Sequence, residues 1–295
     1  MLRRSRKRNR RLIAALADTH AGHTLGLLNP DTVLVRQIDE HGQAEEWCPQ
    51  LTSTQRFLFP LYLEHVNTLK EMAAGDEIIV FHAGDPTQGT KYKDGLIPGV
   101  DRTDQRRIAV ANLMPLLSLP NVQTVRLFTS TPAHVWPGYM DARIAHTLQG
   151  LFPAKSVKSL HHSRTRGGEE IFDTSHHGPH PGSRDWLRGN VAFYYLRDRV
   201  YRDRRMGKEP ARVYIRGHRH TWIQMTLHDR WRLRHSQHDL TVVPSYCGLS
   251  LFGQQVTQSE PELVNGMCIY ELVDGKLAEI HPLIEYTDLR LEETL

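Results

Sequence analysis

Short apolar segments that each end in a carboxylate or a histidine recur along this chain of 295 residues, and this recurrence constrains the fold most. Such segments, rich in β-branched and aromatic residues, are typical of buried strands. Five are found, at residues 11–17, 77–82, 122–128, 169–175 and 211–215. The polar residues that follow them are Asp18 and His20, Asp85, His134, His176 or His177, and His218 with His220. Ligands of open α/β sheets bind at the carboxyl ends of strands, so the pattern predicts a polar site along one edge of a sheet.

The segments between the first strands carry apolar residues at helical spacing, which predicts alternating strands and helices. Helices are expected at residues 51–72, 103–119, 139–151 and 184–205. Thr52 or Ser53 is expected to cap the first of them. After residue 220 the pattern changes to strands without helices between them, as in a second sheet closed by hairpins, and Asp274-Gly275 is a favourable turn.

A single domain over residues 11–295 is expected, preceded by a basic tail over residues 1–10. The formal charge is +4, but seven Arg and Lys residues and no acidic residue lie within the first eleven positions, which leaves −3 for the rest. Such a tail can bind nucleic acid, or it can be a disordered segment that only aids solubility.

The composition also bears on the compartment. No apolar run approaches the length of a membrane span and no secretory signal is recognisable, so we expect a cytoplasmic protein without a membrane partner. Cys48, Cys247 and Cys268 are widely spaced, which argues against a disulfide framework and against a thiolate zinc site. The oligomeric state is left open.

The polar residues at the strand ends offer only carboxylate oxygens and imidazole nitrogens. This donor set suits manganese, iron, zinc or nickel. His218 and His220 share one face of an extended segment, so both rings can reach one ion or two adjacent ions. The natural inference is a centre of two divalent metal ions, with Mn²⁺ expected first and Zn²⁺, Fe²⁺ or Ni²⁺ as alternatives.

The order of these motifs resembles that of the calcineurin-like metallophosphoesterases. The first motif is Asp18-Thr19-His20, the second is Gly84-Asp85, and the last is Gly217-His218-Arg219-His220. The third departs from the family pattern, because Ser130-Thr131-Pro132-Ala133-His134 stands where the family has Gly-Asn-His. In this respect the chain is similar to a subgroup from bacteriophage and prophage genomes.

The resemblance implies a fold and a set of roles. The fold is a four-layer α/β/β/α sandwich of two mixed sheets flanked by helices, which the change of pattern after residue 220 also favours. One ion is bound by Asp18, His20 and His220, the other by His176 and His218, and Asp85 bridges the two. A hydroxide shared by the two ions attacks the phosphate, and His134 protonates the leaving group.

Three assignments stay open. Strand alternation sends His176 and His177 to opposite faces, so only one can readily be a ligand, and His176 is preferred by analogy with the family. The missing asparagine can be replaced by Thr131, by a backbone carbonyl or by water. His134 is either the general acid or the residue that takes the asparagine's place on the second ion.

Three functions are considered. The first is a phosphodiesterase that acts on nucleic acid, most simply a nuclease, because basic residues cluster between Arg197 and Lys208 and mix with aromatic residues at positions 230–234. The second is hydrolysis of small phosphoesters such as cyclic nucleotides or phosphomonoesters. The third is a non-catalytic binding module on an eroded phosphoesterase fold.

Overall fold

The computed structural model describes residues 9–37, 44–91, 95–135, 139–179, 189–231, 234–249 and 262–290. Most of the expected basic tail, the first part of the helix predicted at residues 184–205, and positions 232–233 lie outside these residues. Within the described residues, no helix combines the length and the apolar character needed to cross a membrane. Cys48, Cys247 and Cys268 are all free thiols.

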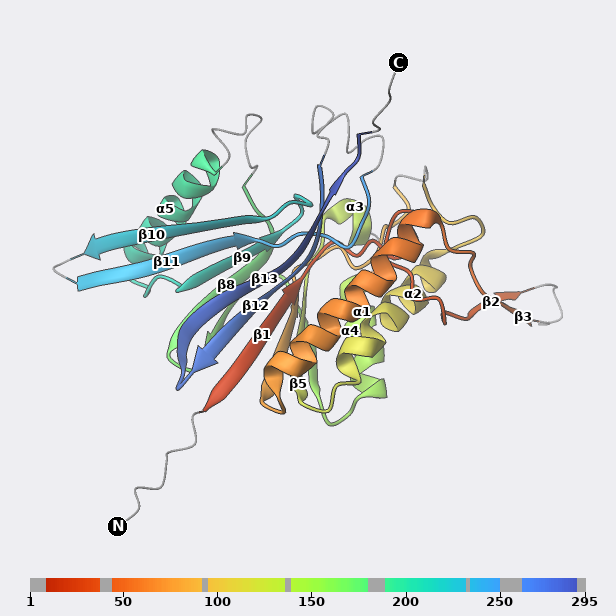
Figure 1. Cartoon of the computed structure of the whole chain (residues 1–295), viewed down its shortest axis with the longest axis horizontal. Coiled ribbons are helices and arrows are strands. Elements are labelled where there is room, and N and C mark those ends of the chain that lie inside the picture. The colour runs from red at the N-terminus through yellow and green to blue at the C-terminus, as the bar shows by residue number, and fades with distance from the viewer. Residues whose placement is uncertain are drawn as a thin grey trace, which may run out of the picture.

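A six-stranded mixed sheet forms one half of the protein (Figure 1). Its strands, in spatial order, are β13 (Lys276–Asp288), β12 (Glu262–Val273), β1 (Arg10–Leu16), β4 (Glu77–His82), β5 (Val122–Phe128) and β6 (Ser156–Leu160). The strands β1, β4, β5 and β6 are parallel, whereas β12 is antiparallel to β1 and β13 is antiparallel to β12.

A five-stranded mixed sheet packs against the first. Its strands, in spatial order, are β10 (Ile223–Trp231), β11 (Arg234–Val242), β9 (Val213–Gly217), β8 (Glu170–His177) and β7 (Ser163–Gly167). The strands β8, β9 and β11 run parallel, and β7 and β10 are antiparallel strands at the two edges. A separate two-stranded sheet consists of β2 (Leu34–Gln37) and β3 (Ala44–Trp47).

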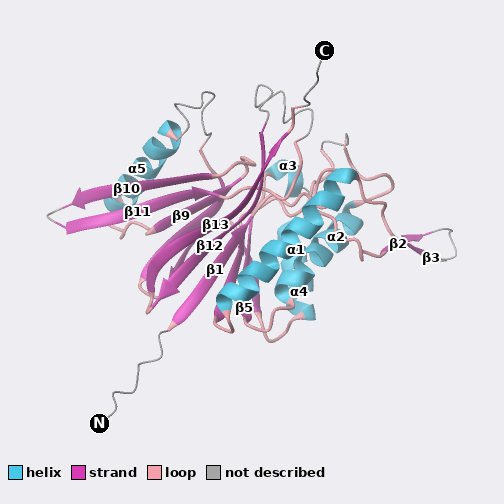
Figure 2. Cartoon of the chain, viewed as in Figure 1, coloured by secondary structure: helices cyan, strands magenta, loops and turns pink. Residues whose placement is uncertain are grey.

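Helices lie on the outer faces of the two large sheets, as Figure 2 shows. They are α1 (Ser53–Ala73), α2 (Arg102–Leu117) and α4 (Met140–Leu151) on the six-stranded sheet and α5 (Asn190–Arg205) on the five-stranded sheet. The short helix α3 (Pro132–Val135) follows the end of β5. Thr52 caps α1, because its hydroxyl accepts from the backbone N–H of Gln55 while the Gln55 side chain accepts from the backbone N–H of Thr52. The predicted capping residue is thereby confirmed.

Three apolar cores separate four layers. Strand β1 is buried on both faces: Leu12 and Leu16 pack against the layer of α1, α2 and α4, whereas Ile13 packs against the second sheet. A third core joins the outer face of the second sheet to α5. The predicted α/β/β/α sandwich is therefore confirmed.

The hairpins after residue 220 differ from the expectation in one respect. Only β10 and β11 extend the second sheet, whereas β12 and β13 turn back at Asp274-Gly275 and join the first sheet beside β1. The reason is that β1 has one edge free after it pairs with β4, and β12 occupies that edge. Sequence alternation shows that a segment is a strand but does not show which sheet it joins.

Arg216, near the end of β9, is fully buried and connects three elements below the strand ends. Its guanidinium donates to the Asp173 carboxylate on β8 at 2.6 Å and to the Asp173 carbonyl at 2.8 Å. Its Nε also donates to the Tyr195 hydroxyl on α5 at 2.8 Å. Because a buried charge is costly unless it is paired and hydrogen-bonded, this group fixes β8 and β9 relative to α5.

Replacing Arg216 by methionine is expected to lower the free energy of unfolding by about 3–5 kcal/mol, since Asp173 would keep a buried charge with only the partly exposed His162 as a side-chain partner. Urea denaturation followed by circular dichroism measures the change. The matched control is Arg166→Met, which breaks an exposed ion pair with Glu209 and should have little effect. Equal losses in the two variants would contradict a structural role specific to Arg216.

Candidate metal centre

The candidate ligands lie together at the carboxyl ends of the parallel strands of both sheets. Asp18 and His20 follow β1, and Asp85 follows β4, all in the first sheet. The second sheet supplies His176 from the end of β8, and His218 and His220 directly after β9. Parallel strands of two packed sheets that end at the same rim bring residues far apart in sequence into one site.

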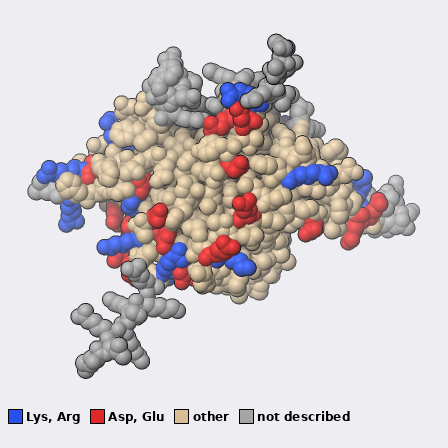
Figure 3. All heavy atoms as spheres, in the orientation of Figure 1, with Lys and Arg blue, Asp and Glu red and all other residues tan. Residues whose placement is uncertain are grey.

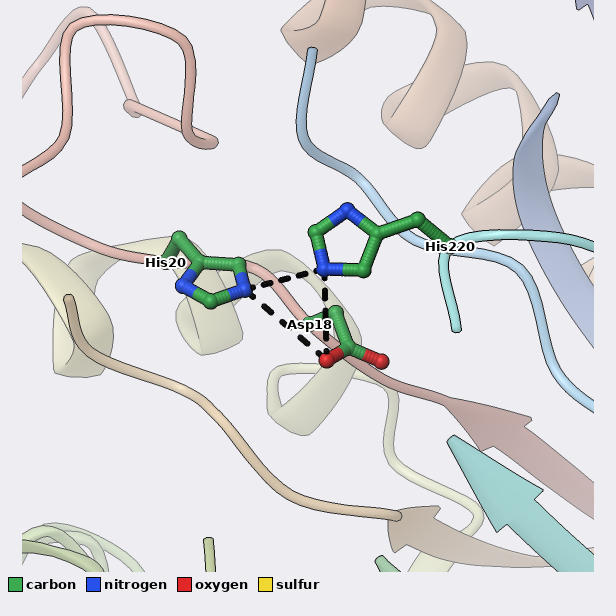
Figure 4. A group of neighbouring side chains, drawn as sticks. All are labelled: Asp18, His20 and His220. Carbon is green, nitrogen blue, oxygen red and sulfur yellow. Dashed lines mark hydrogen bonds and ion pairs between the residues drawn. The ribbon is translucent and has the colours of Figure 1, made fainter. Parts of the chain in front are cut away.

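The first cluster consists of Asp18, His20 and His220 (Figure 4). The Nε2 atoms of the two histidines are 3.2 Å apart, and both face Asp18 Oδ1, at 3.8 Å for His20 and 3.5 Å for His220. The other carboxylate oxygen of Asp18 accepts from the backbone N–H of His218 at 2.8 Å. Asp18 is thus oriented by the neighbouring sheet, with Oδ1 left toward the imidazoles.

The second cluster consists of Asp85, His176 and His218. Asp85 Oδ2 lies 2.9 Å from His176 Nε2 and 4.0 Å from His218 Nδ1. The hydroxyl of Thr131 lies among these three atoms. The backbone N–H of Thr131 donates to Asp85 Oδ1 at 2.9 Å. His176 Nε2 is also 4.0 Å from Asp18 Oδ1, so the two clusters adjoin.

His176 and His177 diverge as strand alternation predicts. His176 is buried, its Nδ1 donates to the carbonyl of Ala83 at 2.7 Å, and its Nε2 faces Asp85. That hydrogen bond fixes the tautomer so that Nε2 of the neutral ring carries a lone pair. His177 is exposed and contacts the cluster only through the rings of its neighbours.

The backbone at the candidate ligands is unusual. Among the described residues, eight that are not glycine have a left-handed backbone, and five of them are candidate ligands. These five are Asp18, His20, Asp85, His218 and His220, with φ between 43° and 73°. Such conformations are costly and gather at functional sites, where the surrounding structure enforces them.

Glycine is required beside the ligands for reasons of space. A Cβ atom at Gly84 would lie 2.3 Å from the ring of His176, and φ there is +111°. At Gly217 a Cβ atom would approach the Ala17 side chain to 2.9 Å and the Asp18 carboxylate to 3.0 Å. The glycines of the second and last motifs therefore let the two sheets approach each other closely at the site.

The protonation states follow from burial and from neighbouring charges. Burial pushes the pKa values of Asp18 and Asp85 up, but His220 and His176 respectively outweigh it and hold both pKa values below the ordinary range. Burial lowers the pKa of His20 well below its usual value. Burial also lowers the pKa of His176, but Asp85 more than compensates and raises it to about 9. Both carboxylates and His20 thus have their metal-binding forms at neutral pH, whereas His176 would release a proton on binding an ion.

Several supporting residues were not foreseen from the sequence. Ser130 donates from its hydroxyl to Asp141 on α4 at 2.7 Å and accepts from the backbone N–H of Asp85 at 2.7 Å. Burial raises the pKa of Asp141 to about 6. No motif marks Asp141, because its role depends on the packing of α4 against the end of β5.

The donor set and the buried polar atoms fit a pair of divalent ions. Asp18 Oδ1 is buried and has no hydrogen-bond partner among the described residues, although three imidazole nitrogens lie within 4.0 Å of it. A buried carboxylate oxygen without a partner is costly, and a cation among these atoms would offset that cost. The two Asp and His clusters therefore fit a dinuclear metal centre.

No family model matches the chain, and no curated protein matches it significantly. One solved structure that matches the chain is the sulfate thiohydrolase SoxB of Termus thermophilus in complex with glycerol. The two chains share 8% identity with a TM-score of 0.37, and the match covers 95% of this chain and 56% of SoxB. The chain thus spans little more than half the length of that protein. At this degree of likeness SoxB carries no argument about function, which rests on the geometry of the site.

Proposed function

We propose that this chain is a metal-dependent phosphoesterase that hydrolyses phosphodiester bonds, with nucleic acid as its substrate. The observation that carries the proposal is the pair of adjoining clusters, each with one buried carboxylate and two imidazoles. Two divalent ions bound there would activate a water molecule and screen the charge of a phosphate. Asp18, His20 and His220 are proposed to hold one ion, and His176 and His218 the other.

Asp85 is proposed as the carboxylate shared by both ions. Its Oδ2 lies 2.9 Å from His176 Nε2 in the second cluster and 3.7 Å from His134 Nε2. The ring of His134 packs edge-on against His20 of the first cluster, with 4.8 Å between centroids. Asp85 Oδ2 therefore faces the space between the two clusters.

His134 is proposed as the general acid. Its Nδ1 hydrogen-bonds the backbone carbonyl of Gln88, and because a carbonyl can only accept, Nδ1 carries the proton. The ring is thereby held with Nε2 toward the centre, where the protonated imidazole can donate to a leaving alkoxide. Thr131, rather than His134, lies among the donors of the second cluster, which favours the acid role over the ligand role.

The outward face of α5 supports nucleic acid as the substrate. Six Arg or Lys residues but only two Asp lie at positions 190–208, and one of these acids, Asp203, is buried against the Tyr214 hydroxyl. Tyr194 and Tyr201 are 61% and 48% exposed on the same face. Exposed aromatic rings among cations can stack on unpaired bases while the cations bind phosphates, so we infer a single-stranded segment as the occupant.

The direction of α5 connects this surface to the metal centre. Tyr195, near the start of α5, is bonded to Arg216 at the end of β9, whereas Asp203, near its end, is bonded to Tyr214 earlier in β9. The start of α5 thus lies at the end of β9 that carries the candidate ligands. The far end reaches the β10–β11 hairpin, where Arg204 packs over Trp231 and where Lys and Arg side chains gather at the left edge of Figure 3.

The central test is an activity panel with Mn²⁺, which includes single-stranded and duplex DNA, RNA, cyclic nucleotides and bis-(p-nitrophenyl) phosphate. Cleavage of single-stranded nucleic acid and of the diester, abolished by chelation and restored by added metal, is expected. Cleavage of small phosphoesters alone would overturn the nucleic acid part of the proposal. A protein that binds metal but cleaves none of these substrates would overturn the phosphoesterase assignment.

The role of His134 is tested by the dependence on the leaving group. His134→Ala is expected to lower the rate on nucleic acid by about 10²–10⁴-fold, because its alkoxide leaving group needs a proton. The loss should be much smaller on bis-(p-nitrophenyl) phosphate, because nitrophenolate departs without one. A variant that lost metal and slowed equally on both substrates would instead identify His134 as a metal ligand.

The α5 surface is tested by charge reversal. Arg197→Glu combined with Arg205→Glu should weaken binding of single-stranded DNA and flatten the dependence of log affinity on log salt by about 0.7 for each phosphate that the surface no longer neutralises. Fluorescence anisotropy at several salt concentrations, with metal withheld, measures both. The matched control reverses exposed Arg56 and Arg143 on α1 and α4, in the opposite helical layer. Equal weakening in the two double variants would mean that overall charge, and not this surface, governs binding.

A further inference from the structure

Thr131 occupies an unexpected position in the second cluster. Its Oγ1 lies 3.1 Å from Asp85 Oδ2, 3.1 Å from His176 Nε2 and 3.2 Å from His218 Nδ1. These three atoms are the candidate donors of one ion, and the hydroxyl is nearly equidistant from all of them. No other hydroxyl among the described residues has such a set of contacts with the candidate ligands.

The spacing is that of donors around one cation. Donor atoms about 2.1 Å from a shared ion lie roughly 3.4 Å apart in a tetrahedron and roughly 3.0 Å apart along an octahedral edge. The three distances to Thr131 Oγ1 fall between these values. The distance from Asp85 Oδ2 to His176 Nε2, 2.9 Å, lies just below this range, and the distance from Asp85 Oδ2 to His218 Nδ1, 4.0 Å, lies above it. Thr131 Oγ1 therefore completes a four-donor polyhedron with two oxygen and two nitrogen atoms.

Hydrogen bonds can also link the hydroxyl to its neighbours, since it donates one hydrogen and accepts through two lone pairs. The near-equal distances to three donors of one cluster are what single out coordination of an ion. An ion among the four atoms would accept a lone pair from each. Threonine and serine hydroxyls are established ligands of Mg²⁺ in phosphate-binding loops, so an alcohol oxygen is an adequate donor for a hard cation.

The loop holds Thr131 in place before any ion arrives. Its backbone N–H donates to Asp85 Oδ1 at 2.9 Å. The preceding Ser130 is fixed by two hydrogen bonds to Asp141, through its hydroxyl and its backbone N–H. Because the oxygen is positioned in advance, little conformational entropy is lost when it coordinates.

We propose that Thr131 Oγ1 is a direct ligand of the ion at Asp85, His176 and His218, and that it biases this site toward oxygen-seeking cations such as Mn²⁺. The inference rests on the proposed dinuclear function and adds a ligand to it. A neutral alcohol thus fills the coordination position of the asparagine that the third motif lacks. His134 remains free to act on the substrate.

The test is Mn²⁺ binding to chelator-stripped protein, measured by isothermal titration calorimetry on the full chain. Thr131→Val keeps the shape of the side chain but removes the oxygen, and Thr131→Ser keeps the oxygen. The matched control is Thr68→Val, which removes a hydroxyl that donates only to a carbonyl of α1. We expect two ions in wild type, in Thr131→Ser and in Thr68→Val. In Thr131→Val the second ion should bind at least about tenfold more weakly. Removing a residue that only hydrogen-bonds to a metal ligand already costs about this much affinity, so the loss of a ligand should cost no less.

The visible spectrum of the Co²⁺-saturated protein tests whether Thr131 binds the ion directly or only positions the other ligands. Loss of a ligand lowers the coordination number and should intensify the visible absorption of Thr131→Val relative to wild type. An unchanged spectrum, unchanged affinity in Thr131→Val, or equal losses in the Val and Ser variants would each overturn the proposal while leaving the dinuclear function intact. A wild-type protein that binds fewer than two ions would overturn the dinuclear function, and the role of Thr131 with it.

Discussion

Two carboxylates buried side by side are the constraint on which the centre depends. Asp18 and Asp85 are almost inaccessible to solvent, and each raises the cost of ionising the other. Imidazoles from the opposite sheet offset that repulsion, and their own positions follow from the length and register of β8 and β9. The strained backbone, the close-packed glycines and the buried Arg216 all serve to keep those imidazoles against the carboxylates.

The layers of the fold were predictable because the central strands are buried on both faces. Such strands form continuous apolar runs, and β4 matches the predicted residues 77–82 end to end. The partly exposed β5 also matches the predicted residues 122–128. The edge strands β6 and β7 were missed, since Ser163–Gly167 contains no apolar side chain that could reveal it. The placement of β12 was also beyond prediction, because its pairing with β1 spans nearly the whole chain.

Part of the site was predictable because the carboxyl ends of parallel strands meet at one edge of a sheet. The sequence placed Asp18, Asp85 and His218 at such ends, and in the structure the backbone of His218 donates to Asp18 while its ring faces Asp85. Their roles as metal ligands remain a proposal. The geometric role of Thr131 had no signal beyond an absent asparagine, and the Ser130–Asp141 contact had none, because both arise only when α4 and β5 are packed.

Each cluster takes donors from both sheets, and His20 and His220 are 200 residues apart in the chain. An ion bound by such residues would act as a reversible cross-link between two layers that otherwise adhere mainly through apolar contacts, with a few hydrogen bonds such as that from the His218 N–H to Asp18. Contacts of such long range form late, after the loops that join them have closed. Bound metal should therefore lower the unfolding rate much more than it raises the folding rate. The lifetime of the folded state would then depend on whether the metal centre is occupied.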